Sequence, residues 1–204
     1  MKRKPHKIPE VLTPDEQARM LAQFNDESPS SVRGRAILRV LLDCGLRAAE
    51  LVNLRHHDVD IDSGRLWVRA GKGSKDRGLW FNGSSRGALL DWLNLKATLP
   101  CGVNFAASGY FFTDLVTGKK KICGRWFRKF TARLAEKAGL DKRGHPHLFR
   151  HTFATDMLRQ GVNLPTIQKM MGHSDIGTTQ IYLSVYDEDV ERAMKNFRSG
   201  GGSL

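Results

Sequence analysis

The positions of apolar residues along the chain predict a mainly helical protein. In several stretches apolar side chains recur every three to four residues, about the period of one face of an α-helix. The clearest start signal is Thr13-Pro14-Asp15-Glu16, which joins a capping hydroxyl, a first-turn proline and a capping-box glutamate. We expect that helix to reach about Phe24. The other helices are expected to run through Ile37 to Leu42 and stop near Gly45, and over Leu46 to Leu54, Ser84 to Leu99, Arg125 to Ala138, Pro146 to Gln160, Pro165 to Met171, Ile176 to Leu183 and Asp187 to Phe197.

Between His57 and Asn82 the pattern changes from helical to β. Short runs of β-forming residues alternate with turn residues such as Ser63-Gly64 and Gly71-Lys72-Gly73-Ser74. The runs are Val59 to Asp62, Arg65 to Arg69 and Gly78 to Phe81. The sequence therefore predicts a fold that is mainly α with a small three-stranded antiparallel β-sheet. We expect residues 1–12 to be a basic arm or linker, residues 13–198 to be one domain, and residues 199–204 to be a flexible Gly-rich tail.

The charge balance indicates a polyanionic partner. The chain has 33 Lys and Arg against 21 Asp and Glu, a formal net charge of +12, which favours nucleic acid. Ribosomal proteins, RNA-binding modules and membrane-surface proteins share such a charge, so it does not identify the partner alone. No stretch approaches the roughly 18 apolar residues of a membrane span, and no apolar signal core follows the first residues. We expect a protein of the cytoplasm, associated with the nucleoid.

The three cysteines, Cys44, Cys101 and Cys123, do not indicate a disulfide framework or a thiolate zinc site. They are odd in number and far apart, and none forms a Cys-x-x-Cys pair. We expect reduced thiols in the core or on the surface.

Two polar features in the C-terminal half have residue types suited to phosphate chemistry. His147 and Arg150 are three residues apart, so they share a helical face and would point into a cleft, while Phe149 turns to the core. Tyr182 follows His173 by about two and a half helical turns. Taken singly, each feature is better explained by a solvated helix face or an ordinary core tyrosine.

Four segments in order nevertheless resemble the motifs of the tyrosine recombinase and phage integrase family. They are CGLRAAEL at 44–51, GKGSKDR at 71–77, HLFRHTFAT at 147–155, and GHS at 172–174 with TQIY at 179–182. The chain is most similar to the Xer and integrase branch, in which the fourth polar position is His rather than Trp. The resemblance implies six active-site residues, namely Arg47, Lys72, His147, Arg150, His173 and Tyr182.

The resemblance implies a metal-independent DNA strand transferase. Tyr182 would attack a DNA phosphate and leave a 3′-phosphotyrosyl bond and a free 5′ hydroxyl, and the reverse step would reseal DNA without a nucleotide, a metal or another cofactor. Arg47 and Arg150 would place paired donors on the phosphate oxygens, where charge accumulates during the attack. The two histidines would donate to the same oxygens, and His147 could also accept the tyrosine proton. Lys72, its pKa lowered by neighbouring cations, would protonate the leaving oxygen.

Some assignments have alternatives. Lys75 lies on the same hairpin as Lys72 and could be the general acid instead, or either lysine could simply contact backbone phosphate. Tyr186 could also reach a phosphate, although Tyr182 has the preceding residues of the family. A metal site is disfavoured, because no acidic ligand accompanies its histidines and an arginine lies among them. Those histidines are His145, His147, His151 and His173.

Other functions and the assembly also stay open. The chain could be a topoisomerase IB-like relaxing enzyme or a telomere resolvase, or a non-catalytic DNA-binding module built around Pro165 to Leu183. Family members usually carry an N-terminal helical domain that clamps DNA, and here about a dozen residues precede the expected domain. The expected partners are double-stranded DNA and, on it, three further copies in a homotetramer. The amphipathic helix Asp187 to Phe197 would then dock on a neighbouring protomer.

Overall fold

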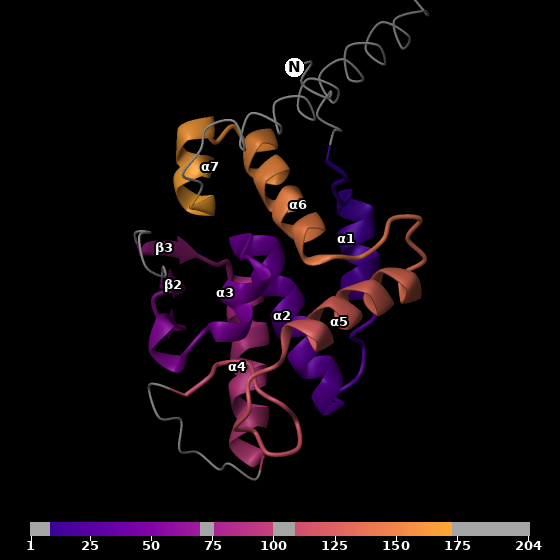
Figure 1. Cartoon of the computed structure of the whole chain (residues 1–204), viewed down its shortest axis with the longest axis vertical. Helices are drawn as coiled ribbons and strands as arrows, with labels where there is room; N and C mark the ends of the chain where they lie inside the picture. Colours follow the sequence, from indigo (N-terminus) through magenta and orange to yellow (C-terminus); the bar gives the residue numbers. More distant parts are fainter. Residues whose placement is uncertain (1–8, 70–75, 100–108, 173–204) are drawn as a thin grey trace, which may run out of the picture.

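The computed structural model describes residues 9–69, 76–99 and 109–172 of the 204-residue chain. Helix α2 runs through the middle of the fold, and α4 and α6 pack against it (Figure 1). The small sheet lies at one side, where β3 also contacts α7. In chain order the elements are α1 (Pro14–Leu21), α2 (Pro29–Cys44), α3 (Ala48–Asn53), the 3-10 helix η1 (His56–Asp58), β1 (Val59–Asp60), β2 (Arg65–Val68), β3 (Arg77–Trp80), α4 (Gly83–Thr98), α5 (Gly124–Lys137), α6 (Pro146–Arg159) and α7 (Leu164–Met171).

The sheet is antiparallel in the order β1-β2-β3, which confirms the predicted fold class. Leu66 pairs with Leu79 and Val68 with Arg77 across β2 and β3. The two leucines and Val68 are buried, so this face of the sheet packs on the core. Trp80 lies on the other face and is exposed.

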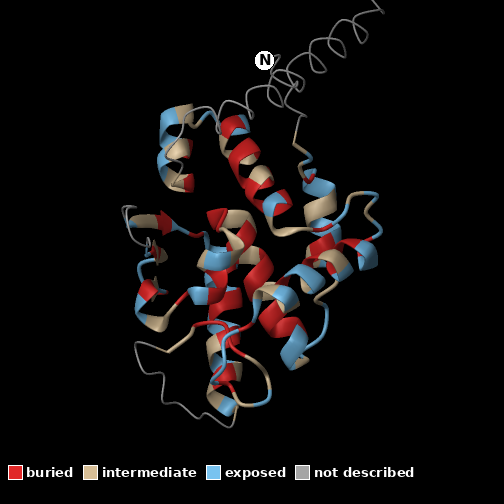
Figure 2. Ribbon diagram, in the orientation of Figure 1, coloured by how far each residue is buried: buried red, intermediate tan, exposed pale blue. Residues whose placement is uncertain are grey.

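The core is formed mainly by α2 and the helices around it (Figure 2). Ile37, Leu38 and Leu41 on α2 are fully buried, and so is Phe149 on α6. Cys44, at the end of α2, is a buried free thiol, and Cys123 is an exposed one. Cys101 lies outside the described residues. Among the described helices, none is long and apolar enough to cross a membrane.

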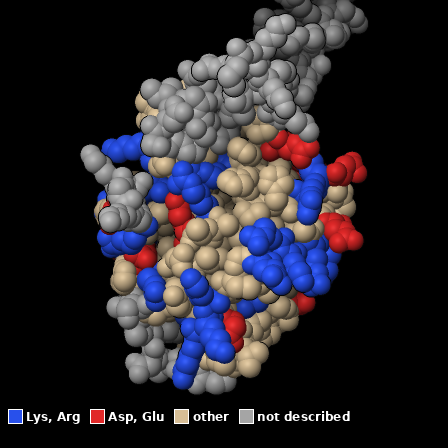
Figure 3. All heavy atoms as spheres, in the orientation of Figure 1, with Lys and Arg blue, Asp and Glu red and all other residues tan. Residues whose placement is uncertain are grey.

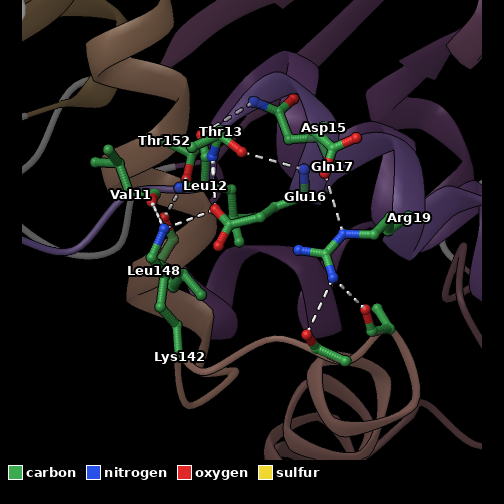
Figure 4. Close-up of polar contacts among 12 residues, drawn as sticks. Val11, Leu12, Thr13, Asp15, Glu16, Gln17, Arg19, Lys142, Leu148 and Thr152 are labelled. Atoms are coloured by element: carbon green, nitrogen blue, oxygen red, sulfur yellow. Dashed lines mark hydrogen bonds and ion pairs between the residues drawn. The ribbon is translucent and has the colours of Figure 1, made fainter.

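The predicted capping box at the start of α1 is present and joins α1 to α6 (Figure 4). The Thr13 backbone N–H donates to Glu16 Oε2 at 2.7 Å, and the Glu16 N–H donates to Thr13 Oγ1 at 3.2 Å. Lys142, before α6, donates to the same Glu16 oxygen at 2.6 Å. The buried Leu12 donates its N–H to Thr152 Oγ1 on α6 at 2.9 Å. The core thus includes Leu12, one residue before the domain start expected at Thr13.

Helix α1 ends three residues earlier than expected. It stops at Leu21 rather than near Phe24. The Phe24 ring instead stacks on Phe130 of α5, with ring centroids 6.2 Å apart. It also lies against Gly34 of α2, where an added Cβ would come within 2.4 Å of the ring. The Phe24 side chain, which seemed to continue α1, therefore packs against α5 and α2 instead.

Other boundaries shift for local reasons. Helix α2 begins at Pro29, well before the predicted apolar run that starts at Ile37, because Ser28 caps it and Pro29 fits the first turn. Strand β1 ends at Asp60 rather than Asp62, because the Asp60 carboxylate accepts the N–H of Ser63 and closes a turn. The predicted helices Ile176 to Leu183 and Asp187 to Phe197, and the turn at residues 71–74, lie outside the described residues.

Candidate active site

The end of α2 forms the base of the candidate site. Gly45 caps the helix with φ of 56°, a left-handed conformation that favours glycine. An added Cβ would lie 2.3 Å from the Phe153 ring on α6. The close approach of these helices allows Arg150 of α6 to reach the end of α2. Its Nη1 donates to the Gly45 carbonyl at 2.7 Å.

Arg150 also connects α6 to the end of α7. Its Nη2 donates to the carbonyl of Met171. The side chain is almost fully buried, with 3% of the residue exposed. A buried guanidinium requires acceptors for its donors, and backbone carbonyls from two other elements supply them here. Arg150 therefore fixes the relative positions of α2, α6 and α7.

Arg47 also contacts the C-terminal end of α7. It is the N-cap of α3, and its Nη2 donates to the Gly172 carbonyl at 2.9 Å. Its Nη1 lies 2.9 Å from Glu50 Oε1, and its backbone N–H donates to the other oxygen of that carboxylate. About 38% of the Arg47 side chain is exposed, so it remains accessible to a ligand.

Glu50 joins Arg47 to a third arginine, Arg77 of β3. Arg77 Nη2 donates to Glu50 Oε2 at 2.8 Å, and Arg77 Nε donates to the Met170 carbonyl at 2.6 Å. Burial alone would raise the pKa of Glu50, but the hydrogen bonds and charges of Arg77 and Arg47 bring it below its ordinary value. The carboxylate is therefore ionised at neutral pH and holds both guanidinium groups.

His147 lies on the first turn of α6, three residues before Arg150, and is exposed. The centroid of its ring is 6.2 Å from the centroid of the His151 ring. Burial, followed by the charges of His147, His145 and Arg150, lowers the pKa of His151 to about 4, so His151 is neutral at neutral pH. His145 caps α6, with its Nδ1 accepting the Leu148 N–H at 3.2 Å, and burial is the main cause of its lowered pKa.

The structure thus brings two of the six sequence-predicted residues to the same end of α7. Arg47 and Arg150 donate to the consecutive carbonyls of Gly172 and Met171, and His147 lies on the same helix as Arg150. The remaining predicted residues lie outside the described ranges, as do both alternatives. They are Lys72, His173 and Tyr182, with the alternatives Lys75 and Tyr186.

Sequence reasoning did not assign a role to Glu50 or Arg77. The sequence did contain a signal for Arg77. It lies two positions before Leu79 in β3, so the two side chains point to the same face of the sheet, which packs on the core. A cation on that face requires an anionic partner. Glu50 was such a partner, one helical step from Arg47, but its contact with β3 depends on the tertiary fold.

Comparison with known proteins identifies the family of the chain. A sequence model of the phage integrase family matches residues 10–189. The tyrosine recombinase XerC of Vibrio cholerae serotype O1 is 36% identical over 201 residues, covering 95% of this chain and 62% of that protein. The crystal structure of the XerA recombinase matches with a TM-score of 0.77 and 30% identity, covering 97% of this chain and 66% of that one.

A second solved structure shows the same fold at lower identity. The XerH site-specific recombinase, bound to a palindromic difH substrate in a post-cleavage complex, matches with a TM-score of 0.78 and 22% identity over 97% of this chain and 56% of that one. The chain spans about three fifths of the length of the curated relatives it matches. The family match over most of the chain shows that the chain belongs to the phage integrase family.

Proposed function

We propose that residues 13–198 are the catalytic domain of a site-specific DNA recombinase, which cuts and rejoins strands through a 3′-phosphotyrosyl intermediate on Tyr182. One observation carries the proposal. Arg47 and Arg150 come from elements far apart in sequence, and their guanidinium groups converge on the end of α7. The residue that follows this point is His173, and Tyr182 lies nine residues further on.

The two arginines suit a phosphate under attack. Charge grows on the non-bridging oxygens as the nucleophile approaches, and guanidinium donors fixed in advance stabilise that charge. The described residues occupy two of the five N–H donors of Arg47, and its exposure allows a phosphate to reach the rest. Arg150 is buried, so we propose that a phosphate oxygen replaces the Met171 carbonyl as the acceptor of its Nη2.

The remaining roles follow the order of proton transfers. His147 is exposed at the start of α6 and would accept the Tyr182 proton, while His173 would donate to a phosphate oxygen. Lys72 would protonate the leaving 5′ oxygen. Because a phosphotyrosyl ester replaces a phosphodiester, resealing needs no nucleotide and no metal in this scheme.

The partner would be double-stranded DNA, in the cytoplasm and on the nucleoid. The net charge of +12 supports this partner, and the structural neighbour XerH is bound to a palindromic difH substrate. We also propose that four copies assemble on DNA and that the helix expected at Asp187 to Phe197 packs on a neighbouring protomer. The four apolar side chains Val190, Ala193, Met194 and Phe197 would share one face of that helix and require a covering surface.

A plasmid assay separates this function from its nearest alternative, a topoisomerase-like relaxing activity. A DNA site would first be selected from a random library and then placed twice in a supercoiled plasmid. A recombinase exchanges the two sites and yields deleted or inverted products, and it does so in EDTA. Relaxation of the plasmid without exchange would support the relaxing enzyme, and neither product would leave a non-catalytic DNA-binding module.

A further inference from the structure

A pocket with an aromatic floor lies between α2, α5 and the segment that follows α1. Its volume is about 340 Å³, within the range of pockets that take a small ligand. The floor is a row of three rings, in which Phe130 stacks with both Phe24 and Trp126, at centroid distances of 6.2 Å and 5.1 Å. All three residues are partly exposed. We call this the aromatic pocket, and its open ring faces suit a planar group that can stack on them.

Arg33 of α2 also lines the aromatic pocket, and it is a buried cation with few partners. Its guanidinium lies 4.4 Å from the centre of the Trp126 ring, and 6% of the residue is exposed. Among the described residues Arg33 forms one hydrogen bond, from Nη1 to the Thr113 carbonyl at 2.8 Å, although a guanidinium has five N–H donors. Burial lowers the pKa of Arg33 to about 10, and the charge of Asp114 opposes this change. The arginine therefore remains cationic at neutral pH.

No described carboxylate pairs with Arg33. Asp114 acts on it through its charge, but the oxygens of that carboxylate accept from three backbone N–H groups of its own turn. The other buried arginine, Arg150, differs, because two of its nitrogens donate to carbonyls of neighbouring elements. A buried cation requires acceptors for its donors, and a ligand in the aromatic pocket can reach Arg33 from the open side.

The rim of the aromatic pocket is also cationic. Lys129, Arg133 and Lys137 lie on the flank of α5 that faces the pocket, and the eleven lining residues include no carboxylate. None of these three side chains forms an ion pair with a described residue. Basic side chains gather over α5 on the face shown in Figure 3. Together with Arg33 they make a strongly positive site, which favours a doubly charged phosphate over a singly charged carboxylate.

The aromatic pocket is separate from the site formed by Arg47 and Arg150. Arg33 lies near the beginning of α2, and Gly45 caps the opposite end of that helix. The two residues are therefore about 18 Å apart along the helix axis, at a rise of about 1.5 Å per residue. A phosphate held by Arg33 is thus a different group from the phosphate that Tyr182 would attack.

We propose that the aromatic pocket binds a nucleotide unit, that is, a planar base joined to a phosphate. The base stacks on the exposed aromatic rings, and the phosphate accepts from Arg33 and from the rim cations Lys129 and Arg133. A phosphate without a base would leave the rings uncovered, and a base without a phosphate would leave the cations unpaired. The unit is either a free nucleoside monophosphate or an unpaired nucleotide of a DNA strand. This ligand site goes beyond the proposed function, since strand transfer at Tyr182 does not require it.

Calorimetric titration of the full chain with adenosine monophosphate tests the proposal. Adenosine lacks the phosphate and ribose 5-phosphate lacks the base, so each should bind about tenfold more weakly than the complete nucleotide. Ribose 5-phosphate also measures any phosphate binding at the Arg47 and Arg150 site. Arg33→Met should weaken binding of the nucleotide about tenfold, because it removes a charged hydrogen bond.

A second variant keeps the test valid if Arg33→Met does not fold. It carries Lys129→Met and Arg133→Met at the rim, where both side chains are exposed, and it should also weaken binding of adenosine monophosphate about tenfold. Arg128→Met is the matched control, because Arg128 is exposed on the same helix but does not line the aromatic pocket. The control should bind the nucleotide as the unaltered chain does.

A single-stranded oligonucleotide and its abasic counterpart distinguish the two sources of the nucleotide. Binding of adenosine monophosphate that the rim variant weakens supports a free nucleotide. If adenosine monophosphate does not bind, but the oligonucleotide binds more tightly than the abasic strand and the rim variant loses this difference, the occupant is an unpaired nucleotide of DNA. The proposal is overturned if neither ligand shows a preference for the base, or if the rim variant and Arg128→Met bind both ligands equally.

Discussion

Replacing Glu50 by Gln tests whether this carboxylate positions the arginines of the site. The change keeps the size of the side chain and removes its charge. Glu50 accepts from Arg47 Nη1 at 2.9 Å and from Arg77 Nη2 at 2.8 Å, and about 15% of its side chain is exposed. A glutamine has only one side-chain oxygen that can accept from these donors, and its amide N–H group would face the other donor. We therefore expect Arg77, which is 10% exposed, to lose its counterion.

The expected loss follows from the contacts. A hydrogen bond to a charged group contributes about 1.5–3 kcal/mol, and the substitution removes roughly one such bond and weakens a second. Partial exposure of Glu50 reduces the effect, so we expect about 3 kcal/mol of destabilisation. For a chain of this size that corresponds to a fall of about 6–12 °C in Tm. Cleavage should fall about tenfold further than folding explains, because Arg47 loses its support.

Thermal unfolding followed by circular dichroism gives the stability, and a single-turnover assay at a temperature where both proteins are folded gives cleavage. The folded pKa of Glu50 is lowered from its ordinary 4.5. Its stabilisation is therefore complete above that value and is lost as the pH falls through the folded pKa. The stability difference between the two proteins should shrink in acid. Glu136→Gln, on the exposed surface of α5, is the control. Unchanged stability and cleavage in Glu50→Gln would refute the positioning role.

Three further predictions concern the arginines, the charge and the helix joint. Arg150→Ala should lower cleavage by about 2–4 kcal/mol of transition-state stabilisation with a smaller effect on DNA binding, while the unaltered enzyme cleaves in EDTA; inhibition by chelator that added zinc or magnesium reverses would contradict the metal-free scheme. Binding to duplex DNA should weaken steeply between low and moderate salt, and tight, salt-insensitive gel shifts would count against it. Gly45→Ala should cost about 1–2 kcal/mol from its left-handed backbone alone, and more from contact with the Phe153 ring. Gly87→Ala on α4, where an added Cβ meets no atom within 4 Å, should be neutral or stabilising, and equal Tm values for these two variants would refute the argument.

The sequence predicted those features in which a residue and its partner lie within a few positions of each other. Thr13 and Glu16 form their capping box within one turn, and Gly45 ends α2 through its own backbone conformation. The short runs of β-forming residues that predicted β2 and β3 do form strands, and one face of the sheet they make is buried. These features depend on residues a few positions apart, so the sequence pattern predicts them.

Long-range contacts explain what the pattern did not predict. Phe24 looked like the last residue of α1, but it stacks on Phe130, more than a hundred positions away. The role of Arg77 depends on Glu50, which the fold places beside it. In the same way, His147 and Arg150 share a helical face, yet one is exposed and the other buried, because α2 and α7 cover only Arg150.

The choice of nucleophile is the most direct test of the proposed function. A nicked suicide substrate built on the selected DNA site releases a short fragment after cleavage, and so traps the covalent protein–DNA complex. An unperturbed tyrosine, with a pKa near 10, is barely ionised at neutral pH, so the attacking residue must lie beside the cationic site. A short stretch of chain joins Tyr182 to His173, so we expect Tyr182 to lie near that site. We predict that Tyr182→Phe abolishes the trapped complex and that Tyr186→Phe retains it, and the reverse pattern would contradict the account.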